Sequence, residues 1–148
     1  MATTTGTFNW YNKGKKHLCG TIDLETTPDV RFLLTSSAYT PDATTHEFVS
    51  SITNELTTNG AVRVAVTGEG WTEPVAGTWM LDFDNPTWTA SGGSIVARYW
   101  VAYIYNASDT AAPLLAYGLL DNTPADVTTT TGNVLTANIN ANGFFRVA

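Results

Sequence analysis

The sequence is poor in charged residues and in the residue types that build most catalytic and metal sites. Only 14% of its 148 residues are charged, whereas soluble proteins carry roughly a quarter. The single cysteine, Cys19, excludes an internal disulfide and a cysteine-based zinc site. Lysine and arginine number 7 against 13 acidic residues. This net charge of -6 argues against nucleic-acid binding, which needs clustered basic residues.

Long apolar segments are also missing from the chain. No run comes near the roughly 18 apolar residues that span a bilayer, so no membrane segment is expected. The start, Met1 to Gly6, has neither the basic nor the apolar region of a secretory signal. We therefore expect synthesis in a cytoplasm, and the length fits one ordinary domain.

Threonine, with 26 residues, takes the place of the missing charge. Its β-branched side chain is stiff at χ1 and suits the solvent face of a pleated sheet. Turn signals every 8 to 12 residues or so are typical of a sandwich or barrel. The sequence predicts an all-β, mainly antiparallel β-sandwich or barrel of about eight strands over residues 8–148. A flexible N-terminal arm, residues 1–7, is expected to precede it.

One short helix is predicted to dock on the sheet, between residues 44 and 59. It would begin at a threonine cap and end at an Asn-Gly pair. Inside this range Phe48, Ile52 and Leu56 recur at i, i+4 and i+8, which gives one apolar stripe on a polar cylinder. The stripe predicts the face that packs on the sheet.

Two segments have the clearest strand patterns. Val62, Val64 and Val66 alternate with other residues, which indicates a strand with one buried face. Ile95–Tyr105 has apolar residues on both parities, which predicts a central strand covered on both faces. Near the C-terminus, the turn 140–143 ends in Asn-Gly, a hairpin signal.

The five tryptophans divide into two groups by their surroundings. Trp79 and Trp100 lie in hydrophobic strands and are predicted to be in the core. Trp10, Trp71 and Trp88 lie near turns, so one or two of them are expected at a contact surface. Exposed tryptophans would also suit a carbohydrate-binding module.

No catalytic constellation is found in the sequence. The two imidazoles, His17 and His46, accompany no G-x-S-x-G nucleophile elbow, and Cys19 is interpreted as a small buried apolar group. Asp82 and Asp84 share one side of a strand about 6 to 7 Å apart, a spacing also found in inverting glycosidases. Because Asp-Asn-Pro is ordinary turn chemistry, we predict a non-enzymatic protein without a metal or cofactor.

A series of short strings follows one another along the chain. They are Gly20–Leu24, Phe32–Asp42, Thr45–Phe48, Ile52–Glu55, Ala97–Tyr99 and Pro113–Tyr117. In this order they resemble a family of small virion structural proteins of tailed bacteriophages, and the resemblance extends from about Phe8 to Val147. The segment Trp71–Pro74 departs from the family pattern.

The resemblance implies a head decoration or cement protein, made in the host cytoplasm and located on the capsid surface of the virion. Its partners would be the major capsid protein lattice and other copies of itself, as a homotrimer. A tail or head-to-tail joining protein is the structural alternative. A carbohydrate-binding surface module is the alternative from another class.

The predicted contact residues lie in the first part of the chain and at one tryptophan. Lys13 to His17 is the only dense basic patch of this acidic chain, so it fits an acidic partner surface. Gly14 within it allows a short helical turn but not a long helix. The residues predicted to contact the capsid or a neighbour are Thr3, Thr4, Thr5, Trp10, Lys13, Lys15, Lys16 and Trp71.

Overall fold

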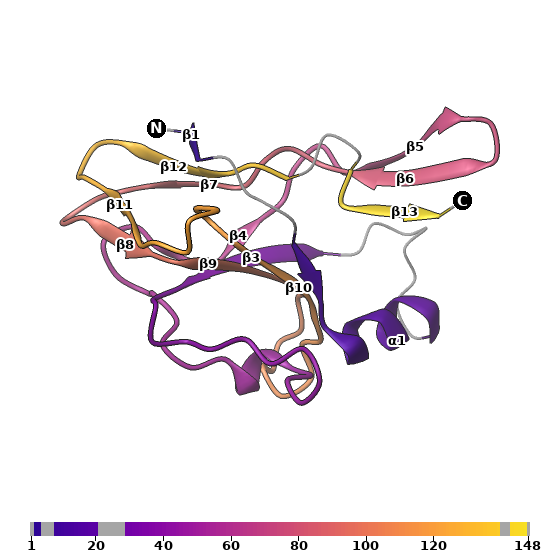
Figure 1. The fold of residues 1–148 in the computed structure, drawn as a ribbon, viewed down its shortest axis with the longest axis horizontal. Helices are drawn as coiled ribbons and strands as arrows, with labels where there is room; N and C mark the ends of the chain where they lie inside the picture. Colours follow the sequence, from indigo (N-terminus) through magenta and orange to yellow (C-terminus); the bar gives the residue numbers. More distant parts are fainter. Residues whose placement is uncertain (1, 4–7, 21–28, 140–142, 148) are drawn as a thin grey trace.

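The computed structural model describes residues 2–3, 8–20, 29–139 and 143–147, which are mainly β-strands (Figure 1). The strands are β1 (Ala2–Thr3), β2 (Asn9–Trp10), β3 (Val30–Thr35), β4 (Val64–Ala65), β5 (Gly70–Val75), β6 (Thr78–Asp82), β7 (Thr87–Thr89), β8 (Ile95–Ala97), β9 (Tyr99–Ile104), β10 (Leu114–Leu119), β11 (Val127–Thr129), β12 (Val134–Ala137) and β13 (Phe145–Val147). The described residues also form one α-helix, α1 (Asn12–Gly20), and a 3-10 turn, η1 (Val49–Ser51).

Two layers of strands form a sandwich (Figure 1). One layer is a five-stranded antiparallel sheet in the order β2-β10-β9-β3-β4. The other layer contains the sheets β1-β12-β7 and β13-β6-β5, and the ribbon β11-β8 lies at one end. Only the pairing of β1 with β12 is parallel among the pairings described. The prediction of an all-β, mainly antiparallel sandwich with one short helix is confirmed, although the position of the helix differs.

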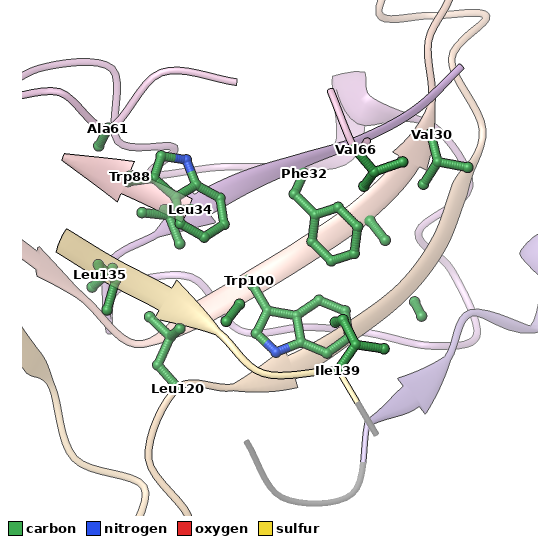
Figure 2. Close-up of a cluster of buried hydrophobic side chains, with 14 of the residues drawn as sticks. Val30, Phe32, Leu34, Ala61, Val66, Trp88, Trp100, Leu120, Leu135 and Ile139 are labelled. Atoms are coloured by element: carbon green, nitrogen blue, oxygen red, sulfur yellow. The ribbon is translucent and has the colours of Figure 1, made fainter. Parts of the chain in front are cut away.

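The main core lies between the two layers (Figure 2). Trp100 of β9 and Trp88 of β7 are its largest side chains, and both are at most 1% exposed. Thr87 and Thr89 on either side of Trp88 are exposed, which is the alternation expected of threonine on the solvent face. The Nε1–H of Trp88 donates a 2.8 Å hydrogen bond to the carbonyl of Val62, so a single side chain ties the two layers together.

The five-stranded sheet is buried on its second face as well. Leu33, Val101 and Tyr103 point away from the sandwich and pack with Tyr11 and Tyr39 in a second cluster. The prediction that the segment Ile95–Tyr105 contains a strand covered on both faces is therefore confirmed for β9. The segment bends at Arg98, so β8 pairs with β11 while β9 pairs with β3 and β10.

The predicted helix over residues 44–59 is wrong, because the structure has only η1 there. A run of bonds to residues four positions earlier does not form, because several backbone groups of this segment bond to distant segments. Val49 N–H donates to the carbonyl of Ala112 at 2.9 Å, and Leu56 N–H to that of Leu34 at 2.8 Å. The apolar stripe thus belongs to a loop whose residues divide between the two cores: Ile52 packs against the cluster on the second face of the sheet and Leu56 against the main core.

The α-helix forms instead over Asn12–Gly20, where only a short turn was predicted. Gly14, which argued against a long helix, is the residue that lets α1 dock on the sheet. A Cβ atom at Gly14 would overlap the carbonyl oxygen of Leu114, so the helix backbone lies directly on β10. The packing energy gained from this close approach offsets the low helix propensity of glycine.

The remaining predictions concern the N-terminal arm, the C-terminal hairpin turn, the valine strand and the membrane. Ala2 and Thr3, in the predicted arm, pair with Thr136 and Ala137 of β12, and the other arm residues lie outside the described residues. The predicted hairpin turn lies in 140–142, which are also outside them. The valine strand is shorter than predicted, because only β4 is paired. Within the described ranges, no helix has the length and apolar content needed to cross a membrane.

Candidate functional site

An apolar groove of about 290 Å³ lies between α1 and β13. Its walls are Trp10 of β2, Leu18 and Cys19 of α1, and Phe145 of β13, with Lys15 as the one charged residue. We call it the α1–β13 groove. It brings together Trp10 and Lys15, two of the residues predicted from the sequence to contact a neighbour.

The orientation of α1 decides which side chains reach the groove. Gly14 and Leu18, four residues apart, form the buried face on β10. Lys15 follows Gly14, and Cys19 follows Leu18. These two side chains therefore lie on the neighbouring face of the helix, which lines the groove. Cys19 is exposed, so the interpretation of this thiol as a buried apolar group is wrong. The interpretation failed because the helix places Leu18, not Cys19, in the core.

A chain of hydrogen bonds fixes the start of α1 against the loop that follows β3. The hydroxyl of Tyr11 bonds to that of Tyr39 at 2.8 Å, and the hydroxyl of Tyr39 bonds to Nδ1 of His46 at 2.9 Å. Because the amide N–H of Asp42 also points at this Nδ1, the nitrogen accepts and Tyr39 donates. Burial raises the pKa of Tyr39 to about 12 and that of Tyr11 further, so both tyrosines stay protonated.

The basic cluster predicted from the sequence divides into two parts. Lys13 forms a 2.7 Å ion pair with Glu47, and His17 lies 3.2 Å from the same carboxylate. The hydrogen bond from Lys13, and then that from His17, lowers the pKa of Glu47. Lys15 and Lys16 are exposed and form no ion pair with any residue that the structure describes. Of these two lysines without an ion-pair partner, Lys15 lines the groove.

Aromatic contacts connect the groove to the core and to the β5–β6 hairpin. The ring of Trp10 lies 5.1 Å from that of Phe144 and 5.7 Å from that of Phe145. Phe144 is buried in the main core, whereas Phe145 faces the groove. Phe145 in turn contacts Trp71 of β5 edge-on at 6.1 Å. The predicted contact residue Trp71 therefore adjoins the groove wall.

The prediction that Trp79 lies in the core is wrong, because its side chain is 50% exposed. Trp71 and Phe145 are both opposite Leu81, and Trp79 lies two residues from it on the same face. Leu81 is covered, but Trp79 is nearer the hairpin end, which projects beyond the five-stranded sheet (Figure 1). Trp79 thus extends the aromatic face. The prediction for Trp100 is confirmed.

Several groove residues were not predicted as contacts, namely Leu18, Cys19, Phe145 and the nearby Trp79. Alternation could have found Phe145, since only one of two adjacent strand residues can face the core. Of the predicted residues, Thr4 and Thr5 lie outside the described residues. Thr3 pairs with β12, away from the groove in the strand order.

Of the two carboxylates singled out in the sequence, Asp82 and Asp84, the second has a clear structural contact. Asp84 accepts a 3.0 Å hydrogen bond from the hydroxyl of Thr67, and its N–H donates to the Thr67 carbonyl at 2.8 Å. This carboxylate fastens two loops, which is a structural role. In the described part of the chain, no three His, Cys, Asp or Glu side chains are grouped to hold a metal ion.

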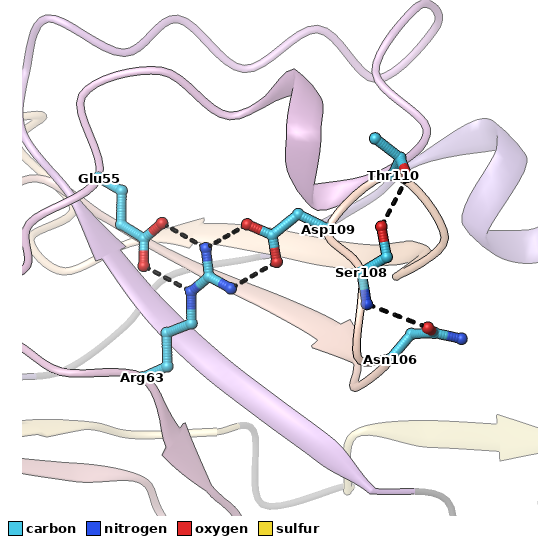
Figure 3. Close-up of polar contacts among 6 residues, drawn as sticks. All are labelled: Glu55, Arg63, Asn106, Ser108, Asp109 and Thr110. Carbon is cyan, nitrogen blue, oxygen red and sulfur yellow. Dashed lines mark hydrogen bonds and ion pairs between the residues drawn. The ribbon is translucent and has the colours of Figure 1, made fainter.

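A second polar cluster, not predicted from the sequence, centres on Arg63 (Figure 3). Its guanidinium donates two 2.7 Å hydrogen bonds to Glu55 and two, of 2.7 and 2.9 Å, to Asp109. Hydrogen bonding from Arg63 lowers the pKa of Asp109. The pairs join loops 8 and 46 residues apart in the sequence, so the cluster is a clamp between loops.

Arg63→Met is expected to lower the free energy of unfolding by about 1 to 2 kcal/mol at neutral pH, since exposure partly screens these pairs. A carboxyl whose folded pKa is lowered stabilises the fold above its unfolded pKa, and this stabilisation is lost as the pH falls through the folded value. Urea unfolding from neutral pH down to about pH 3 should therefore show a shallower acid loss in the variant than in the wild type.

Arg31→Met is the control for that experiment. Arg31 makes a similar two-bond contact with Asp29, but these residues are two positions apart, so the pair joins no distant segments. We expect its effect to stay below about 1 kcal/mol. An equal effect of the two substitutions would contradict the clamp.

Comparisons of the chain with models of protein families, with curated proteins and with solved structures gave no match. The chemistry of the site is therefore the basis for a function. An apolar groove with aromatic walls and uncompensated lysines is suited to protein contact, because interface cores are rich in aromatic residues and interface rims in charge.

Proposed function

We propose that this protein is a non-enzymatic structural protein of a bacteriophage virion, namely a capsid decoration protein that stabilises the expanded head. The order of the short strings in the sequence motivates the proposal. The observation that supports it best is the convergence of Trp10 and Lys15 beside Phe145, with Trp71 adjoining. Three of the residues proposed as contacts from the sequence, Trp10, Lys15 and Trp71, thus lie on one surface.

The fold suits attachment to a repeating surface. The central sheet is packed on both faces, so the body that carries the groove is rigid. A rigid groove loses little entropy on binding, and the aromatic wall supplies apolar area. Exposed lysines at its rim favour approach to an acidic surface. A homotrimer would match the symmetric positions that a capsid lattice offers.

Attachment of the purified protein to undecorated expanded heads tests the proposal. We expect saturable, stoichiometric binding and heads that withstand higher temperature. Lys15→Gln with Lys16→Gln should weaken attachment about tenfold, because two attractive charges at the contact are lost. No attachment of the wild type under any salt condition would refute the proposed function.

Thr87→Glu with Thr89→Glu is the matched control, because it changes the net charge by the same two units on an exposed strand of the other layer. This control should attach as the wild type does. Equal weakening in both variants would show an effect of total charge only.

The alternatives make different predictions. A tail or head-to-tail joining protein would be present in few copies per particle, and a decoration protein in hundreds. A carbohydrate-binding module would use the half-exposed ring of Trp79 as a stacking platform. A glycan array signal abolished by Trp79→Ala would favour that alternative.

A further inference from the structure

The tip of the β5–β6 hairpin presents an apolar side chain beside a fixed carboxylate. Val75 is 60% exposed, and its neighbours Pro74 and Ala76 are exposed as well. Oε1 of Glu73 accepts a 2.8 Å hydrogen bond from the backbone N–H of Gly77, which holds the carboxylate at the turn. Figure 1 shows this tip pointing away from α1, so it does not fill the groove of its own molecule.

The α1–β13 groove has the complementary properties. Its volume of about 290 Å³ is at the lower limit of small-molecule pockets, about 300 Å³, and suits one or two apolar side chains. Apart from Lys15 its wall is made of aromatic, aliphatic and thiol groups, which cannot orient a polar ligand. Lys15 lines the groove, and Lys16 is the next, exposed residue of α1, so a carboxylate beside the inserted side chain would meet positive charge there.

Charge also favours a second copy of this chain as the occupant. With a net charge of -6, two copies repel each other over most of their surfaces. The segment from Lys13 to His17 is the only dense basic patch in the sequence, and Glu47 neutralises its Lys13 side. The groove side of α1 is therefore where another acidic copy is attracted.

We propose that the β5–β6 tip of one copy docks in the α1–β13 groove of a second copy. Val75 then enters the apolar groove, and Glu73 faces Lys15 and Lys16. Because tip and groove are different surfaces and each copy has both, the contact repeats from copy to copy, and a rotation that closes gives a ring-shaped oligomer. The inference deepens the proposed function, on which it rests: Lys15 and Lys16 then act in attachment by holding neighbouring copies together at symmetric positions on the head.

Disulfide trapping tests the contact directly. Cys19 is the only cysteine of the chain and lies in the groove wall, so Val75→Cys places the second thiol at the tip. Mild oxidation of the full-length variant with dithiodipyridine should give covalent oligomers. Mass spectrometry should locate the disulfide between Cys19 and the introduced cysteine of another copy.

Val62→Cys is the matched control for the trapping. Val62 is 56% exposed and lies outside the hairpin, just before β4. Because docking raises the effective concentration of the two thiols, Val75→Cys should cross-link at least about tenfold faster than the control. Equal rates, or links between two introduced cysteines only, would overturn the inference.

A charge exchange tests the same contact without covalent chemistry. Lys15→Glu with Lys16→Glu, and separately Glu73→Lys, should each weaken self-association in sedimentation about tenfold. The triple variant, which exchanges both signs, should restore it. Glu73→Lys brings the net charge nearer to zero, so general repulsion cannot explain a weaker association of that variant.

The outcomes separate this inference from the proposed function. Self-association that is unchanged in the charge variants would overturn the inference. If these variants lose only attachment to heads, the shell protein occupies the groove, and the proposed function stands without the inference. Intact, charge-dependent self-association with no attachment to heads would support the contact and refute the proposed function.

Discussion

Trp88→Ala is expected to lower the free energy of unfolding by about 3 to 5 kcal/mol, which for a small domain is a large part of its stability. Trp88 is 1% exposed, so its removal leaves a cavity in the main core, beside Leu34 (Figure 2). Its Nε1–H also bonds to the carbonyl of Val62, which would lose its partner. Urea unfolding followed by circular dichroism measures the change.

Two further substitutions separate the causes. Trp88→Phe keeps an aromatic ring but removes the N–H, so an intermediate loss of about 1 to 3 kcal/mol is expected. Trp79→Ala removes the same residue type from a position that is 50% exposed, and about 1 kcal/mol or less should be lost. If Trp79→Ala were as destabilising as Trp88→Ala, the placement of Trp88 in the core and of Trp79 at the surface would be wrong.

Gly14→Ala should have the second largest effect, a loss of about 3 kcal/mol together with displacement of α1. The new Cβ would overlap the carbonyl oxygen of Leu114 and lie 2.9 Å from that of Leu115, and backbone atoms of β10, which is paired on both edges, cannot move aside. The gain of about 1 kcal/mol in helix propensity offsets only part of this. Displacement of α1 also deforms the groove.

Gly20→Ala is the control for the docking of α1. Gly20 is the last residue of the helix, and a Cβ there meets no atom within 4 Å. Its substitution should leave stability and self-association within error of the wild type. Equal unfolding free energies for the two variants would show that α1 does not lie on β10 as described.

The sandwich could be predicted because its central strand has a pattern that only one environment explains. Apolar residues on both parities of β9 require cover on both faces, and β9 has it. The stripe of Phe48, Ile52 and Leu56 was ambiguous, because a loop lying on a sheet can bury the same residues that a helix would. Backbone hydrogen bonds to distant segments decided the outcome, and periodicity contains no information about them.

The candidate site was predictable in its residue types but not in its shape. Lysines next to aromatic residues indicated a contact surface, and Trp10 and Lys15 indeed share a groove. The third wall comes from Phe145, more than a hundred residues away, whose position depends on the pairing of β13 with β6. The clamp of Arg63 likewise depends on loops that only the complete fold brings together.

The hairpin of β5 and β6 is structurally separate from the five-stranded sheet. Of the strands, these two pair only with each other and with β13, whereas the five-stranded sheet is enclosed by two clusters of buried side chains. Changes at the exposed end of the hairpin therefore leave the packing of the central sheet unchanged. Related chains could keep one scaffold and acquire new assembly specificity by exchanging this hairpin alone, in the way that loops diversify on a constant framework.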